Sequence, residues 1–178
     1  MKTIEISLNN EGSIKDAIKE LRAYKKSINN KTRSLVSRLI TAGLRVAHEN
    51  VNGNGDKQIV TFSKDIHQSN LVVMGKIIIT SSPHTDDQGR TFYPHLAVEF
   101  GAGIFYNNGN ANPKASEFGM GVGTFPNQKY AINPGYWYYR DEAGVLHPSF
   151  GTEAKMPMYK ASKAVIDQVN QIAKEVFG

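Results

Sequence analysis

Apolar residues recur at intervals of three and four positions in the first third of the chain and again near its C-terminal end. A first stripe covers residues 14–21 and a second covers residues 35–46, with the polar stretch SINNK at residues 27–31 between them. Such spacing places the apolar side chains on one face of an amphipathic helix. We therefore expect residues 1–55 to be mainly helical, with a break or bend at SINNK.

The pattern at the C-terminal end predicts one more helix. Proline is favourable in a first helical turn, so this helix is expected to begin at about Pro157. Its apolar face is formed by residues at spacings of four, three and four, namely Val165, Val169, Ile172 and Val176. Residues 151–178 are therefore predicted to form a C-terminal helical region.

The middle of the chain, residues 56–150, is rich in β-branched and aromatic residues, which favour strands. The segments IVTF (59–62) and LVVMGKIIIT (71–80) are predicted to be strands, separated by the polar connection SKDIHQSN. Strands that follow one another through short polar connections pair most readily in the antiparallel sense.

A further strand is predicted at residues 93–100, within the stretch LAVEFGAG. Leu96, Val98 and Phe100 alternate along it and would share the core face. Glu99 would then lie on the opposite, outward face.

A long glycine-rich insertion, residues 101–134, follows this strand, and loops of such length in compact domains are usually functional. An aromatic strand at residues 136–139 and an extended return come next. The order of helices, then strands, then a helix predicts an α+β fold with an antiparallel sheet, in a single domain spanning residues 1–178.

Charge is concentrated near the N-terminal end. The chain has a net charge of +5, and residues 15–38 contain eight basic residues against two acidic ones, a net charge of +6 for that segment alone. A basic segment of this kind can face DNA or an acidic protein surface. The residues expected to do so are Lys25, Lys26, Arg33 and Arg38.

The glycine patterns do not match nucleotide-binding motifs. A G-x-G-x-x-G fingerprint starting at Gly101 would need glycine at position 106, where Tyr106 stands, and no G-x-x-x-x-G-K-[ST] motif occurs. The chain has no cysteine, which excludes disulfides, thiolate zinc sites and a cysteine nucleophile. Neither a dinucleotide site nor a Walker-type phosphate loop is therefore expected.

The polar groups with metal-like composition are the HTDD stretch, which contains His84, together with His95 and Glu99. On an extended strand, His95 and Glu99 would lie about 13 Å apart, too far to bind one ion. No zincin or nucleophile-elbow motif is present. An enzyme that uses Glu99 or the HTDD stretch remains an alternative, but no motif selects it.

The second half of the chain resembles the tailed-bacteriophage neck and tail-completion proteins, also described as head–tail connector or minor structural proteins. The resemblance covers about residues 93–178, from LAVEFGAG and the glycine alternation FGMGVG through YWYY to GTEAKMPMYKAS. The positions that match the family pattern are Glu99, Phe100, Gly101, Gly103, Trp137, Tyr138, Met156, Pro157, Met158 and Ala161.

The resemblance implies a virion structural protein that forms a homo-oligomeric ring between the head connector and the tail. It implies neither enzyme activity nor a cofactor. The implied partners are phage connector or stopper proteins and tail-tube or tail-terminator proteins, and no contact with a membrane is implied. The residues expected at a subunit interface are Glu99, Phe100, Gly101, Gly103, Trp137 and Tyr138. The alternative is a nucleic-acid-binding domain that uses the basic segment 15–38.

Overall fold

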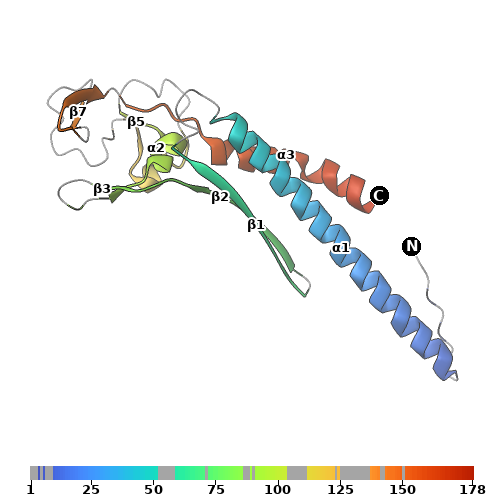
Figure 1. Cartoon of the computed structure of the whole chain (residues 1–178). Helices are drawn as coiled ribbons and strands as arrows, with labels where there is room; N and C mark the ends of the chain where they lie inside the picture. Colours follow the sequence, from blue (N-terminus) through green and yellow to red (C-terminus); the bar gives the residue numbers. More distant parts are fainter. Residues whose placement is uncertain are drawn as a thin grey trace.

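A computed structural model describes residues 4, 6, 10–51, 59–70, 72–85, 89, 91–103, 112–122, 124, 137–140, 143–149 and 151–178. Figure 1 shows an elongated molecule in which a long helix runs beside a hairpin and a second, shorter helix. The helices are α1 (Glu11–Glu49), α2 (Pro94–Phe100), the 3₁₀ turn η2 (Ala115–Phe118) and α3 (Pro157–Phe177). The strands are β1 (Thr61–Ser69), β2 (Val72–Thr80), β3 (His84–Thr85), β4 (Thr91–Phe92), β5 (Ala102–Gly103), β6 (Gly121–Val122), β7 (Trp137–Arg140) and β8 (Leu146–Ser149).

The predicted α+β class is confirmed. Within the described residues, however, the strands form four separate two-stranded sheets rather than one sheet. Three of the pairs are antiparallel, whereas β5 and β6 are parallel. The predicted C-terminal helix is confirmed, and its start at Pro157 is correct.

The expected break at SINNK is wrong, because α1 continues through it as one helix of 39 residues. The stretch contains neither glycine nor proline, and asparagine costs a helix less than about 1 kcal/mol relative to alanine. Thr32 keeps its hydroxyl satisfied by donating to the carbonyl oxygen of Ile28, at 2.9 Å. At the N-terminal end, the side chain of Asn10 accepts a hydrogen bond from the backbone N–H of Gly12 and caps the helix.

The stretch SKDIHQSN was also wrongly predicted, since it forms most of β1. This strand pairs with β2 in a register that runs from Thr61 opposite Thr80 to Ser69 opposite Val72. Its half-buried residues include Phe62 and Ile66, so a period of two is present beneath the polar composition. The exposed polar residues Ser63, Asp65 and His67 alternate with them on the other face, which is why the segment resembled a loop.

The C-terminal half of α1 packs against both the β1–β2 hairpin and α3. A glycine in β2 allows the close approach to the hairpin, because a Cβ atom on Gly75 would lie 2.5 Å from Cγ1 of Ile40 and 2.7 Å from Cγ1 of Val36. On α1, a Cβ atom on Gly43 would lie 2.8 Å from both Ile77 of β2 and Val165 of α3. These two glycines therefore let three elements meet at van der Waals contact.

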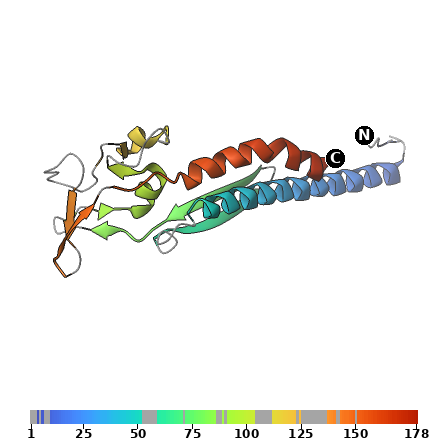
Figure 2. The ribbon, with the colours of Figure 1, turned by 90° about the horizontal axis from the view of Figure 1, so that it is seen from above.

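The helices α1 and α3 run antiparallel and side by side (Figures 1 and 2). Near one end, Lys160 donates to Asn50, and at the other end Lys31 lies over the ring of Phe177, the last residue of α3. The part of α1 before Lys31 therefore extends beyond α3. We call residues 11–30 the arm.

Two small buried clusters lie beyond the end of the helix pair at which Lys160 contacts Asn50, on either side of α2. One cluster contains Ala97, Phe100, Ala102, Ala115 and Met120. The other contains Val51, Val60 and Val98, with Phe62 and Ile79 packed against it. This arrangement fixes α2 between the hairpin and the segment that contains η2.

Candidate functional site

The predicted strand at residues 93–100 is wrong, and this error changes the position of Glu99. Residues Pro94–Phe100 form α2, and the last four of them are all buried. Strand alternation and one helical turn both bring Leu96 and Phe100 to the same side, so the short apolar pattern could not separate the two structures. Glu99 is only 6% exposed and does not face outward.

Glu99 caps the N-terminus of α3. Its Oε2 accepts a hydrogen bond from the backbone N–H of Met158 at 2.8 Å, and its Oε1 accepts one from that of Tyr159 at 3.0 Å. Oε1 also accepts a bond of 2.8 Å from the side-chain amide of Asn112. A helix N-terminus presents backbone N–H groups without helical partners and favours negative charge. A carboxylate from α2 therefore replaces the cap that the sequence just before α3 does not supply.

That missing local cap is visible in the backbone. Met156 occupies the N-cap position with a φ of 54°, and its side chain makes no capping bond. The adjoining N–H of Lys155 donates instead to the carbonyl oxygen of Val98, at 2.9 Å. The start of α3 is thus held by α2 through both backbone and side-chain bonds.

Burial raises the pKa of Glu99 above its ordinary value. The hydrogen bonds from Met158, Tyr159 and Asn112, together with the charge of Lys160, act in the opposite direction. Both carboxyl oxygens are engaged by donors of this chain, so the described contacts assign Glu99 to holding α3.

The N-terminus of α2 is held by a remote side chain in the same way. The hydroxyl of Ser81 accepts a hydrogen bond of 3.2 Å from the backbone N–H of His95, and it lies 2.9 Å from Nδ1 of the same histidine. Burial lowers the pKa of His95. His95 and Glu99 thus engage different partners, and the described residues include no cluster of three or more His, Cys, Asp or Glu residues able to hold a metal ion. Asp86 and Asp87 of HTDD lie outside the described residues.

Gly101 completes this structure by ending α2 and admitting a neighbouring segment. Its φ of 72° and ψ of 167° lie in a region that is essentially restricted to glycine. A Cβ atom at this position would lie 3.0 Å from both the carbonyl oxygen of Thr152 and the backbone nitrogen of Ala154. Next to it, Ala102 and Thr152 exchange two backbone hydrogen bonds, of 2.9 and 2.8 Å. We call α2, Gly101 and residues 151–159 the junction.

The junction assigns a role to each residue of the E-F-G motif. Glu99 caps α3, Phe100 stacks on Phe118 with ring centroids 4.7 Å apart, and Gly101 lets the chain before α3 approach. Gly103, also buried, donates to the carbonyl oxygen of Thr124 at 2.7 Å.

The six residues expected at a subunit interface therefore separate into two groups. Glu99, Phe100, Gly101 and Gly103 lie together, but inside the subunit. Tyr138 is 45% exposed on β7, whereas the side chain of Trp137 lies outside the described residues. The contacts described for the first group are all made within the subunit.

The four cations expected to face DNA or an acidic partner also separate. Lys26 and Arg33 lie seven positions apart, which brings them to nearly the same face of α1. They belong to a row of exposed cations at spacings of four, three, four and seven, which we call the cation row: Lys15, Lys19, Arg22, Lys26 and Arg33. Lys25 lies on a different face of the helix.

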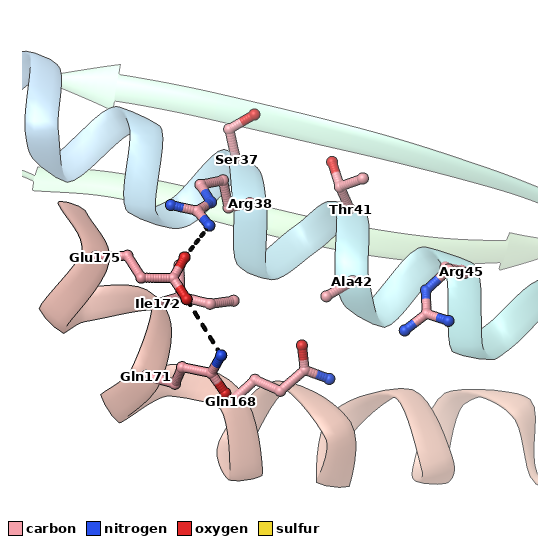
Figure 3. A pocket seen from close by; sticks show the side chains of 9 residues that line it. All are labelled: Ser37, Arg38, Thr41, Ala42, Arg45, Gln168, Gln171, Ile172 and Glu175. Carbon is pink, nitrogen blue, oxygen red and sulfur yellow. Dashed lines mark hydrogen bonds and ion pairs between the residues drawn. The ribbon is translucent and has the colours of Figure 1, made fainter.

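Arg38 instead faces α3. It forms an ion pair with Glu175, and this pair lowers the pKa of the glutamate. Figure 3 shows Arg38 and Arg45 on one wall of a groove between α1 and α3, with Glu175, Gln171 and Gln168 on the other. Gln171 donates to Glu175 at 3.1 Å, and Arg45 pairs with Glu49 at 3.1 Å. The charged groups of this groove are thus largely satisfied within the chain.

Two exposed apolar surfaces were not predicted as candidate sites. The first, which we call the arm stripe, contains Ile14, Ile18, Leu21 and Ile28, between 37% and 53% exposed. The second, the outer hairpin face, contains Val72, Met74 and Ile78, between 41% and 60% exposed. The sequence pattern showed the stripe on the first helix and a β-branched strand at residues 71–80, but it could not show that the chain leaves these surfaces uncovered.

Comparisons with known proteins add no assignment: no family model matches the chain, and neither a curated protein nor a solved structure matches it. Among the described helices, none is both long enough and apolar enough to cross a membrane.

Proposed function

We propose that this chain is a virion structural protein of a tailed phage or prophage, a ring-forming neck or tail-completion subunit that joins the head connector to the tail. The observation that supports the proposal most strongly is the pair of uncovered apolar surfaces, the arm stripe and the outer hairpin face. Large exposed apolar patches are typical of protein interaction sites. A ring subunit needs two different patches, because each copy contacts one neighbour on either side.

The sequence resemblance supports the same proposal through the junction. Three of the residues that carry the resemblance, Glu99, Gly101 and Met158, take part in the contacts that fix the start of α3 against α2. In this proposal they have a structural role and catalyse no reaction. Partners would be the connector or stopper on one side of the ring and tail-tube or terminator proteins on the other.

The proposal predicts concentration-dependent assembly of the purified chain, or assembly upon addition of connector-bearing heads. Mass measurement after gel filtration, combined with negative-stain images, would show ring-shaped oligomers of one size. A chain that remains monomeric at high concentration and binds neither heads nor tails would contradict the proposal.

A second candidate function, nucleic-acid binding, is favoured by the cation row. Its five side chains are exposed along one face of α1, and DNA phosphates attract such an array. In this alternative, the row would contact DNA that passes through the neck or another nucleic acid.

The alternative predicts a measurable salt effect. Replacing Lys26 and Arg33 by glutamate is expected to weaken DNA binding and to lower the slope of log affinity against log salt by about 2 units, one for each lost phosphate contact. Fluorescence anisotropy with duplex DNA at several salt concentrations measures both quantities. The matched control replaces Lys76 and Lys163, which are exposed elsewhere, with the same change in charge. Equal weakening by both pairs of substitutions would exclude a specific role for the row.

A further inference from the structure

The arm stripe is the uncovered continuation of an interface that already exists within the chain. Along α1, the positions on this face alternate at spacings of four and three, a heptad-like pattern: Ile14, Ile18, Leu21, Lys25, Ile28, Thr32, Leu35, Leu39, Ala42 and Val46. From Leu35 onward these residues are at least half-buried, because α3 and the hairpin lie against this half of the helix. Before Lys31 the apolar residues Ile14, Ile18, Leu21 and Ile28 of this face stay 37–53% exposed, although the neighbouring Ala17 is only 5% exposed.

An isolated arm is a poor helix in water. The arm has 20 residues and is therefore about 30 Å long. It is only slightly longer than the 12 to 15 residues below which even an alanine-rich isolated helix is marginal in water. The ion pair between Lys15 and Glu11 is exposed, and exposed pairs of this kind stabilise a helix only slightly. A partner that covers the stripe would supply the stabilisation that most protein helices obtain from packing.

We propose that the arm of one copy packs on the outer hairpin face of a neighbouring copy. This inference rests on the proposed ring, and it names the two surfaces that meet in it. The inner face of the same hairpin already receives α1 of its own chain, at Gly75. The outer face would receive a second helix, so that the two-stranded sheet lies between two helices.

The two surfaces match in character and in size. The outer hairpin face presents Val72, Met74 and Ile78, and its facing charges, Asp65 and Lys76, lie directly opposite each other in the register. The face is therefore close to neutral and can accept a basic arm without repulsion. A strand of nine residues is about 30 Å long, which equals the length of the arm.

Charge argues against the other self-association, in which two arms would pair as a coiled coil. Lys25 lies within the stripe and Arg22 lies on its flank, whereas Asp16 is on the opposite side of the helix. In a parallel pair Lys25 of one arm would lie against Lys25 of the other, and like charges at such positions disfavour pairing.

The same chain cannot make this contact, because its hairpin turns the inner face toward its own α1 while the arm points away beyond α3 (Figure 1). The contact is therefore head-to-tail, the type that closes into rings or extends into filaments. One face of a helix this long covers only about 300 Å², less than the 800 Å² or so per partner of a stable interface. A single contact is thus expected to be weak and to persist mainly in a closed ring or on a connector.

Disulfide cross-linking tests the contact in the full-length chain, which contains no cysteine of its own. One variant carries Lys25→Cys on the arm, and a second carries Lys76→Cys on the outer hairpin face. After mild oxidation, a mixture of the two is expected to give a mixed disulfide dimer, while neither variant alone gives a dimer. A double variant with both substitutions is expected to give a ladder of oligomers that ends at the closed ring.

The matched control replaces Asp16, nine positions from Lys25 and therefore on the opposite side of the helix, by cysteine. Mixed with Lys76→Cys, it is expected to give no dimer. Dimers of Lys25→Cys alone would show arm-to-arm pairing and overturn the inference. Rings visible by electron microscopy but without the mixed disulfide would also overturn it, and would leave the proposed function intact. Mixed disulfides from a chain that never enters phage particles would support the contact and reject the proposed function.

Discussion

Replacing Glu99 by alanine is expected to lower the free energy of unfolding by about 3–5 kcal/mol, because it leaves one buried and two part-buried donors without their acceptor. Two of these donors are the backbone N–H groups of Met158 and Tyr159, and the third is the side-chain amide of Asn112. For a protein of this size, each kcal/mol corresponds to about 2–4 °C in the melting temperature. Urea denaturation followed by circular dichroism measures the free-energy change directly.

The control is Glu153→Ala, which removes an exposed carboxylate close to the start of α3. Its effect is expected to stay within about 0.5 kcal/mol, as is usual for surface substitutions. Equal stability of the two variants would show that Glu99 does not cap α3 in solution.

The pH dependence gives a second and independent test of Glu99. Burial holds the pKa of Glu99 above the ordinary value of 4.5, so the folded chain binds this proton more readily than the unfolded chain. The resulting stabilisation is fully present below the ordinary value and is lost as the pH rises through the raised pKa. The advantage of the unmodified chain over Glu99→Gln is therefore expected to grow on acidification through that window. An advantage that shrinks on acidification would contradict the raised pKa.

Replacing Gly101 by alanine is the other substitution with a large expected effect, about 3–5 kcal/mol of destabilisation. A non-glycine residue in this backbone region costs about 1–3 kcal/mol. The new Cβ atom would also lie 3.0 Å from backbone atoms of Thr152 and Ala154, which two hydrogen bonds between Ala102 and Thr152 hold close. Chemical denaturation of the purified variant measures the sum of these two effects.

Gly119 is the matched control for Gly101. It also has a positive φ, of 61°, but its ψ of 28° places it in the left-handed helical region, and a Cβ atom there would have nothing within 4 Å. Gly119→Ala is therefore expected to cost only about 1–2 kcal/mol, from the backbone conformation alone. If both substitutions cost the same, the close approach of residues 151–155 to Gly101 would not contribute to stability.

The sequence could predict elements whose signals are local. The α3 helix has a proline at its first position and an apolar stripe over five turns, and β2 has a run of β-branched residues. The segment 93–100 also has a proline at its first helical position, Pro94, but its seven residues are too few to separate a helical period from a strand period. Its true state depends on Ser81, which caps the helix from a position 14 residues earlier.

The role of Glu99 could not be predicted for a related reason. A glutamate between apolar residues is ordinarily assigned to an outward face, because buried charges are rare unless they are paired. The donors that permit its burial are Asn112 and the start of α3, which lie 13 and about 60 positions away. Local patterning contains no information on such partners.

The exposed surfaces illustrate a different limit. The stripe on α1 has the same spacing before and after Lys31, although the described elements α3 and the β1–β2 hairpin lie only against its later part. An apolar stripe has the same sequence pattern whether its own chain or another copy covers it. The cation row was hidden because the expected break at SINNK separated Lys26 from Arg33.

We propose above all that this chain is a ring subunit between the head and the tail of a phage particle. Electron cryo-microscopy of particles from the phage or prophage that encodes it, with mass spectrometry of the same particles, tests the claim most directly. The account predicts that the chain is present and that a symmetric ring at the neck fits α1, α3 and the β1–β2 hairpin. Particles that lack the chain, with every neck density explained by other proteins, would contradict it.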